Sequence, residues 1–122
     1  MKPIKVWVIP AGPNPWKVVV VLEELGIPYE VESIKFENVK DEPFIDVNPN
    51  GRVPAIEDPN TDTTLWESGA IIQYLVAQYD THTKLTYGTF KEKSLLNQWV
   101  MFQVSGQGPY YGQCTWYVAR HA

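Results

Sequence analysis

The sequence predicts an α/β domain followed by a helical segment, and three observations support that fold class. Residues 4–9 and 29–34 are strand-like runs joined by a helical pattern, which is typical of a strand-helix-strand unit. Two shorter strand-like runs and a second helical pattern follow within 55–79. The helical period then returns at 90–104 after a polar stretch.

The first unit is marked by residues that start and stop secondary structure. Residues 4–9 are rich in β-branched side chains and end at a proline. Pro15 suits the first turn of a helix, where its missing N–H costs nothing, and Gly26 is a typical stop signal. The run 18–21 consists of valines with strand propensity, but the flanking signals favour a helix. Strand, helix and strand together imply a right-handed parallel unit.

The second unit contains shorter elements. Residues 41–47 predict a short helix, and 55–57 and 64–66 predict two strands around a turn-rich connection. Ser68 suits the N-cap position of the helix that follows. The buried face of that helix is expected to contain Ile71, Ile72, Leu75, Val76 and Tyr79.

These patterns divide the chain into 1–80, a linker at 81–89, and a helical segment at 90–122. The apolar face of that last segment contains Leu95, Leu96, Trp99, Val100 and Phe102. Gly106 and Pro109 interrupt the helical pattern, so we expect a kinked or broken helix there.

Composition argues against several broad classes of protein. With 122 residues, of which 44% are hydrophobic and 20% charged, the chain fits one packed domain with an appended element. A net charge of -4 argues against nucleic-acid binding, which usually shows a basic patch. No apolar run approaches the roughly 20 residues of a membrane span. With no secretion signal before the first strand, we expect a cytoplasmic protein that has no membrane partner.

Cysteine and histidine usage limits the redox and metal chemistry. Cys114 is the only cysteine, so no internal disulfide or two-cysteine redox centre can form. We expect it to be a packed small residue rather than a nucleophile. His82 and His121 lack the spacing of metal ligands, and the sequence therefore predicts no metal.

Two short segments give the strongest indication of a ligand. Segment 48–56 offers main-chain groups next to Pro54, and segment 67–71 places a carboxylate and a hydroxyl where a helical pattern starts. A helix N-terminus can receive an anion, because its first N–H groups have no intrahelical partner. An acidic side chain beside it can hold an ammonium. The pattern fits a peptide-like ligand such as a γ-glutamyl group, which carries both charges on one carbon.

The same segments carry a resemblance to a known family. The element order is that of the thioredoxin fold, and the motifs resemble the glutathione-binding domain of glutathione transferases, in the fungal class related to the yeast nitrogen-catabolite regulator. The matching segments are 12–18, 48–56, 66–71 and 97–109. The resemblance implies a thioredoxin-like domain with a mixed four-stranded sheet and flanking helices, then the start of an all-helical C-terminal domain. Family members continue through that second domain, so we expect a chain truncated within it.

The resemblance assigns a catalytic role to Asn14. Its amide would donate a hydrogen bond to the glutathione sulfur and stabilise the thiolate. The alternative is an asparagine in a proline-rich turn. The dipeptide Val53-Pro54 resembles the family's cis-proline pair, and the Val53 main chain would pair with the cysteinyl residue of glutathione in the manner of an added strand. An ordinary trans turn is the alternative there.

The resemblance assigns the remaining ligand contacts to charged and polar side chains. Glu67 would meet the γ-glutamyl ammonium, and Ser68 the adjacent carboxylate. A simple helix-capping pair is the alternative. Lys40 and Arg52 are candidates for the glycine carboxylate, or else solvated surface charges.

Glutathione is accordingly the expected co-substrate, and a small electrophile or a peroxide the expected second substrate. The alternatives are a catalytically weak glutathione-binding or regulatory module, or a fragment of a longer transferase. We also expect a homodimer, in which the helix at 90–105 is exchanged between chains or packs against a second copy.

Overall fold

The computed structural model describes the backbone of residues 1–121 and the side chains of residues 1–119. The chain divides into two compact units, Met1–Lys84 and Leu85–Ala122, and each is described by itself. The boundary after Lys84 falls inside the predicted linker.

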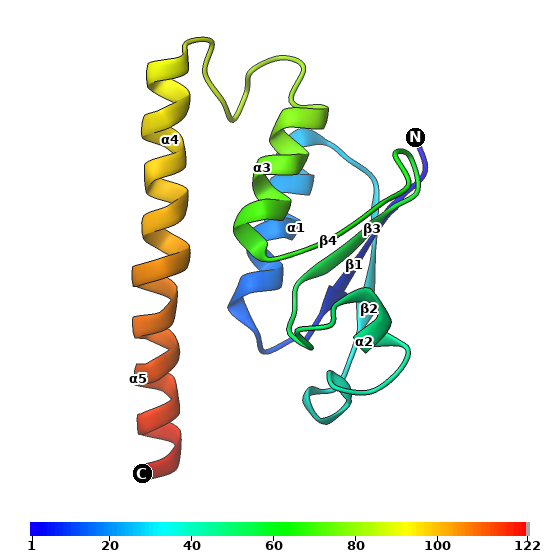
Figure 1. Cartoon of the computed structure of the whole chain (residues 1–122), viewed down its shortest axis with the longest axis vertical. Helices are drawn as coiled ribbons and strands as arrows, with labels where there is room; N and C mark the ends of the chain where they lie inside the picture. The colour runs from blue at the N-terminus through cyan, green and yellow to red at the C-terminus, as the bar shows by residue number, and fades with distance from the viewer. Residues whose placement is uncertain (122) are drawn as a thin grey trace. The chain divides into compact units, whose positions relative to one another are not determined.

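The first unit is built on a four-stranded mixed sheet (Figure 1). Its strands are β1 (Ile4–Val8), β2 (Tyr29–Ser33), β3 (Ala55–Asp58) and β4 (Thr63–Trp66), in the spatial order β2-β1-β3-β4. β1 pairs parallel with β2 and antiparallel with β3, which pairs antiparallel with β4. The predicted thioredoxin-like arrangement is confirmed.

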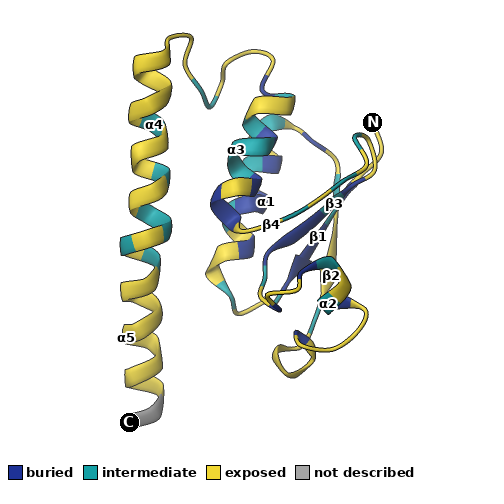
Figure 2. Ribbon diagram, viewed as in Figure 1, coloured by how far each residue is buried: buried dark blue, intermediate teal, exposed yellow. Residues whose placement is uncertain are grey.

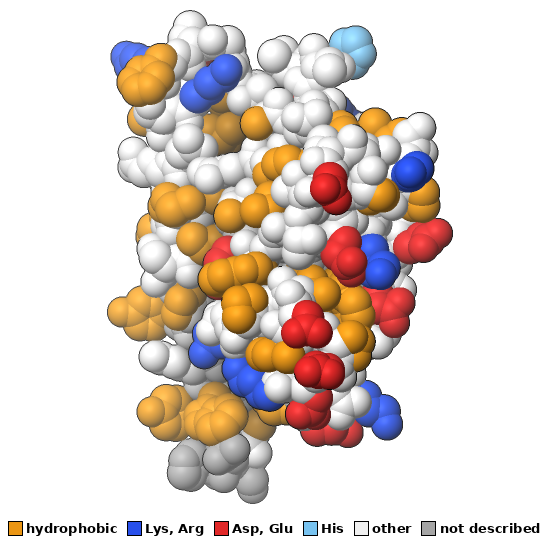
Figure 3. Space-filling model, turned by 45° about the vertical axis from the view of Figure 1, so that its right-hand side comes forward, with side chains coloured by type: hydrophobic (Ala, Val, Ile, Leu, Met, Phe, Trp, Pro, Cys, Tyr) orange, Lys and Arg blue, Asp and Glu red, His pale blue; other side chains and the backbone are white. Residues whose placement is uncertain are grey.

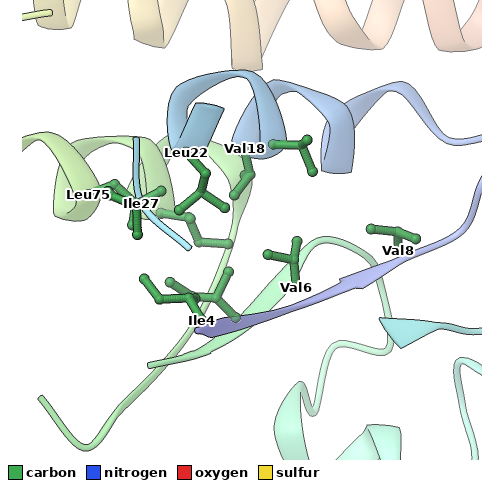
Figure 4. Packing of buried hydrophobic residues seen from close by; sticks show 10 residues of the cluster. Ile4, Val6, Val8, Val18, Leu22, Ile27 and Leu75 are labelled. Carbon is green, nitrogen blue, oxygen red and sulfur yellow. The ribbon is translucent and has the colours of Figure 1, made fainter. Parts of the chain in front are cut away.

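Two helices cover one face of this sheet. The helices are α1 (Pro13–Leu25) and α3 (Ser68–Tyr79). Figure 4 shows Val18 and Leu22 of α1 packed against the strand residues Ile4 and Val6, with Leu75 of α3 beside them. Burial on this face explains why the valine run folds as helix, since tertiary packing overrides propensity.

The opposite face of the sheet carries a smaller cluster. Because side chains alternate along a strand, Trp7 points away from its β1 neighbours and contacts Phe44, with ring centroids 5.2 Å apart. Phe44 begins the short helix α2 (Phe44–Val47), and a 3₁₀ turn, η1, lies at Phe36–Asn38. α2 is shorter than the predicted helix 41–47 because Pro43 occupies its N-cap.

The sequence predicted the C-terminus of α1 correctly but misplaced the N-cap of α3. Gly26 adopts a left-handed φ of 66° and ends α1, with the Ile27 N–H donating to the Leu22 carbonyl as in a Schellman motif. The prediction of Ser68 as N-cap is wrong. Glu67 holds that position and Ser68 is the first helical residue, because Glu67 is the last residue with non-helical dihedrals.

The second unit is helical throughout its described length after residue 89. Thr89 caps α4 (Phe90–Phe102): its hydroxyl accepts from the Glu92 N–H at 3.3 Å and donates to the Glu92 carboxylate at 2.6 Å. A π-helical turn, η2 (Gln103–Gln107), leads directly into α5 (Gly108–His121). Figure 2 shows these helices as mostly exposed, in contrast to the buried β1.

The predicted break near Gly106 is therefore replaced by a π-turn. Pro109 cannot donate a backbone hydrogen bond, and the Gly108 N–H instead donates to the Gln103 carbonyl, five residues back. Such a π-turn is a known way to accommodate an insertion in the α-helical ladder without ending the helix. The pattern is interrupted where expected, but the helix continues.

Candidate functional site

Two uncapped helix N-termini lie at the same end of the sheet. α1 and α3 pack side by side and run in the same direction, so that each begins at its own lower end in Figure 1. Their N-cap residues, Gly12 and Glu67, make no side-chain hydrogen bond to the first turn. The first N–H groups of α3 are left for an external acceptor, whereas Pro13 and Pro15 in the first turn of α1 have no N–H to offer. Both helix dipoles favour negative charge there.

Glu67 has an unusual backbone conformation for its residue type. Its φ is 73° and its ψ 114°, although residues other than glycine rarely adopt positive φ. Such a backbone conformation costs on the order of 1–3 kcal/mol, and residues that adopt it cluster at functional sites. The side chain is exposed, so this conformation presents a carboxylate to solvent at the start of α3.

Ser68 follows Glu67 and is only 5% exposed. Within residues 1–119, its hydroxyl has no hydrogen-bond partner, and no buried side-chain oxygen in that range is left unsatisfied. The hydroxyl is therefore open to solvent while the rest of the residue is packed. It can donate to, or accept from, a ligand at the α3 N-terminus.

Lys17 is the charged residue at this end that the sequence prediction missed. It lies three residues after Asn14 on α1 and is half-buried. Burial lowers its pKa below the usual value, and the nearby Glu67 carboxylate opposes that shift without cancelling it. It lies within segment 12–18 and at helical spacing from Asn14, but neither signal shows that Glu67 lies near it.

Asn48 organises the loop that leads to Val53. Its side chain is 1% exposed. The amide nitrogen donates to the Arg52 carbonyl at 2.6 Å, and the amide oxygen accepts from the Asn50 N–H at 2.9 Å. The turn continues through Gly51, which has a φ of 59°. In the sequence Asn48 stands out only as part of segment 48–56, because these bonds form only in the folded loop.

The peptide bond between Val53 and Pro54 is cis, as the resemblance implied. Val53 is half-buried and precedes Ala55, the first residue of β3 that pairs with Trp7 and Trp66. The Val53 main chain therefore lies just beyond the paired part of the sheet.

The structure separates the two basic candidates. The Lys40 ammonium donates to the Asn50 carbonyl at 2.6 Å and lies against Gly51, where an added Cβ would come within 2.6 Å of the lysine side chain. Arg52 has an exposed side chain, and only its carbonyl is engaged, by Asn48. Lys40 is thus held at the loop, whereas Arg52 extends into solvent.

Asn14 is the second residue of α1 and is exposed. The preceding loop is fixed by two hydrogen bonds. The Gly12 N–H donates to the Ile9 carbonyl at 2.8 Å, and the Trp16 indole N–H donates to the Pro10 carbonyl at 2.9 Å. The Asn14 amide is therefore presented from a rigid turn at a helix N-terminus.

Metal binding and thiol chemistry would each depend on His, Cys, Asp or Glu side chains. In that part of the chain, no three His, Cys, Asp or Glu side chains converge to hold a metal ion, and the His121 side chain lies outside it. Cys114 is exposed, so the expectation of a packed residue is wrong. In the described part of the second unit, no other helix or strand packs over α5.

Comparison with known proteins agrees with this geometry. The sequence model of the family described as "Glutathione S-transferase, N-terminal domain" matches residues 2–77. The chain is 52% identical to "Glutathione S-transferase-like protein gedE" of Aspergillus terreus over 98% of its length and 53% of the relative's. It is 39% identical to "Protein URE2" of Candida maltosa, covering 84% of this chain and 33% of that one.

A solved structure is similarly close. The glutathione transferase URE2P6 from Phanerochaete chrysosporium, in complex with oxidized glutathione, is 48% identical with a TM-score of 0.88, covering 98% of this chain and 56% of that one. The protein belongs to the glutathione S-transferase family. It resembles the members of that family related to the URE2 proteins. It spans about half the length of gedE and URE2P6, and a third of the length of the Candida maltosa URE2 protein. Over the described residues, none of the helices has the length and apolarity needed to cross a lipid bilayer.

Proposed function

We propose that this chain binds glutathione at the shared N-terminal end of α1 and α3. The observation that carries the proposal is Glu67, an exposed carboxylate held at a positive φ directly before an uncapped helix. A γ-glutamyl group carries an ammonium, which Glu67 would bind, and a carboxylate, which the N-terminus of α3 would bind. The 48% identity to a transferase solved with oxidized glutathione supports the same ligand.

The rest of the ligand follows the loop toward Lys40. Ser68 contacts the γ-glutamyl carboxylate through its hydroxyl and N–H. The Val53 main chain pairs with the cysteinyl residue, as a strand added beyond β3. Lys40 and Arg52 take the glycine carboxylate, and Lys40 is the better placed because the Asn50 carbonyl already holds its ammonium.

The proposed chemistry centres on the glutathione sulfur near Asn14. The Asn14 amide donates to the thiolate, and the α1 N-terminus adds favourable partial charge. Both effects lower the thiol pKa. The thiolate then attacks a small electrophile and displaces its leaving group, or two glutathione molecules reduce a peroxide to alcohol and water while forming a disulfide.

A binding or regulatory module with little turnover is the alternative. It is favoured by the similarity to proteins named URE2 beside those named transferases. A fragment of a longer transferase is the third possibility. A cytoplasmic location stays a prediction from the sequence.

Calorimetric titration with glutathione and a thiol-conjugation assay on the same sample test the proposal. Glu67→Ala should weaken binding by about 1.5–3 kcal/mol, as for a charged hydrogen bond. Glu30→Ala is the matched control, since Glu30 is an exposed carboxylate on the edge strand β2. Equal affinity in wild type and Glu67→Ala would exclude this assignment.

We also propose that the protein forms a homodimer through the helical unit, with the helix at 90–105 packed against a second copy or exchanged. Leu95, Trp99 and Phe102 share one side of α4 by helical spacing and are 49%, 64% and 57% exposed. The rings of Trp99 and Phe102 meet edge to face at 5.7 Å. Figure 3 shows hydrophobic side chains spaced along this unit. Burying each would contribute about 1.5–3 kcal/mol.

A further inference from the structure

The strand β2 lies at an exposed edge of the sheet. It is the end strand in the order β2-β1-β3-β4, and within the described residues it pairs only with β1. Four of its five residues are exposed. An edge of this kind presents unpaired backbone groups, to which another extended chain can add as a further strand.

The backbone groups of alternate β2 residues point away from β1. The Ile34 N–H, just beyond the end of the strand, donates to the Val8 carbonyl at 2.9 Å. In a parallel pair, residues whose main-chain groups face the neighbouring strand alternate with residues whose groups face away. The outward N–H and carbonyl groups of this edge are therefore those of Tyr29, Val31 and Ser33.

The two faces of this edge carry side chains of different chemistry. Side chains in register across a sheet point to the same face. Glu32 is in register with Trp7, so its carboxylate and that of Glu30 lie on the face that carries the Trp7 cluster. Val31 is in register with Val6 on the helix-covered face and is 45% exposed, although Val6 is fully buried. The edge thus offers negative charge on one face and an uncovered apolar side chain on the other.

A pocket of about 480 Å³ lies where α1 ends and β2 begins, and it is lined by Leu22, Glu23, Gly26, Ile27, Pro28 and Tyr29. Leu22 and Ile27 are buried and apolar. The Glu23 carboxylate already accepts a hydrogen bond from the Tyr29 hydroxyl at 2.6 Å. Because the charged group in its wall has a partner, the pocket suits an apolar side chain from a strand that adds to β2.

We propose that the β2 edge binds an extended segment of a partner protein in which basic and apolar residues alternate. The basic side chains pair with Glu30 and Glu32, and the apolar ones cover Val31 and enter the pocket. A second copy of this chain does not fit. Symmetric pairing of two β2 strands about Val31 would set each Glu30 opposite a Glu32, and like charges directly opposite one another destabilise a sheet.

The test uses the peptide fluorescein-Arg-Val-Arg-Val-Arg-Val-Arg-amide, whose binding is measured by fluorescence anisotropy. Two further peptides carry an N-methyl group either on every valine or on every arginine after the first, so their mass and charge are equal. In antiparallel addition the valine main chains face β2, and methylating them should weaken binding by at least about tenfold. Methylating the arginines, whose N–H groups then point away from the sheet, should leave the affinity unchanged. A loss confined to the arginine-methylated peptide would support parallel addition to the same edge.

Protein variants test the edge and its charges. Val31→Pro removes an outward N–H, which an edge strand tolerates, and it should also lower the affinity for the parent peptide by at least about tenfold. The double variant Glu30→Gln/Glu32→Gln should weaken binding by about fivefold at low ionic strength. The control Asp41→Asn/Asp46→Asn removes two exposed charges elsewhere and should bind as wild type does.

Circular dichroism checks that each variant is folded, and the methylated peptides decide the question even if Val31→Pro is not. Equal affinities of the two methylated peptides would reduce the interaction to charge attraction and overturn the proposal. Equal losses in the two double variants, or a wild-type protein that does not bind the parent peptide, would overturn it as well.

Discussion

Asp58 provides the sharpest test of how this fold holds its site, through the variant Asp58→Ala. The carboxylate is 2% exposed. It accepts hydrogen bonds from the Tyr74 hydroxyl at 2.7 Å and the Tyr79 hydroxyl at 2.5 Å. The Asn60 N–H and side-chain amide donate to its other oxygen, both at 2.9 Å. The group therefore ties the β3–β4 turn to the C-terminal half of α3.

The magnitude follows from these contacts. A hydrogen bond to a charged group is worth about 1.5–3 kcal/mol, and bonds that share one acceptor are not additive. We therefore expect Asp58→Ala to lower the free energy of unfolding by about 3 kcal/mol. At about 4–8 °C per kcal/mol for a domain of this size, the Tm should fall by roughly 15 °C. Urea unfolding followed by tryptophan fluorescence measures the loss, with the exposed Asp41→Ala as control.

The pH dependence gives a second readout of the same residue. Burial alone would raise the pKa of Asp58, but the hydrogen bonds from Tyr79, Tyr74 and Asn60 together lower it. Because the folded-state pKa is depressed, the stabilisation is present above the unfolded pKa of about 3.9 and is lost as pH falls through the folded pKa. The difference between wild type and Asp58→Ala should thus shrink only below about pH 4. A loss under about 1 kcal/mol at neutral pH would refute the reasoning.

Three further predictions concern the site and the helical unit. Asn14→Ala should reduce the conjugation rate more than it reduces glutathione affinity. The loss in rate should be smaller than the factor of about 10²–10³ measured when an oxyanion donor is removed from a water-free site. If wild type and Asn14→Ala have the same conjugation rate, the chain is a binding module. Gly51→Ala should cost at least about 1–2 kcal/mol and weaken glutathione binding, because a Cβ there meets both Lys40 and the Val39 carbonyl at 2.6 Å; a variant as stable as wild type in urea would contradict this. Light scattering at micromolar concentration should show a dimer that Trp99→Ser dissociates; a monomeric wild type would reject the proposed interface.

Local signals were enough to predict the scaffold. Pro15 and Gly26 bracket α1 in the sequence, and the helix begins and ends beside them. The valines between them favour a strand by propensity, yet Val18 is fully buried against the sheet as part of a helix. Start and stop residues act through the backbone of their own segment, which is why one sequence reveals them.

The polar groups that brace the site could not be predicted in this way. Asp58 looked like an ordinary turn residue, because its tyrosine partners lie 16 and 21 residues further along the chain. Lys17 was missed for the same reason, since Glu67 comes near it only when α1 packs on α3. Long-range partners become neighbours through the tertiary fold, and no local pattern of residue types encodes them.

The conformation of Glu67 shows why the bracing matters for binding. A positive φ costs on the order of 1–3 kcal/mol, so the elements on both sides must hold it. Trp66 precedes it and pairs with Ala55 in the sheet. On the other side, the Ile71 N–H donates to the Glu67 carbonyl at 2.9 Å, and the far end of the same helix is fixed by Asp58. The strained carboxylate is thus set between a strand and a helix that are each anchored elsewhere, which positions it before any ligand arrives.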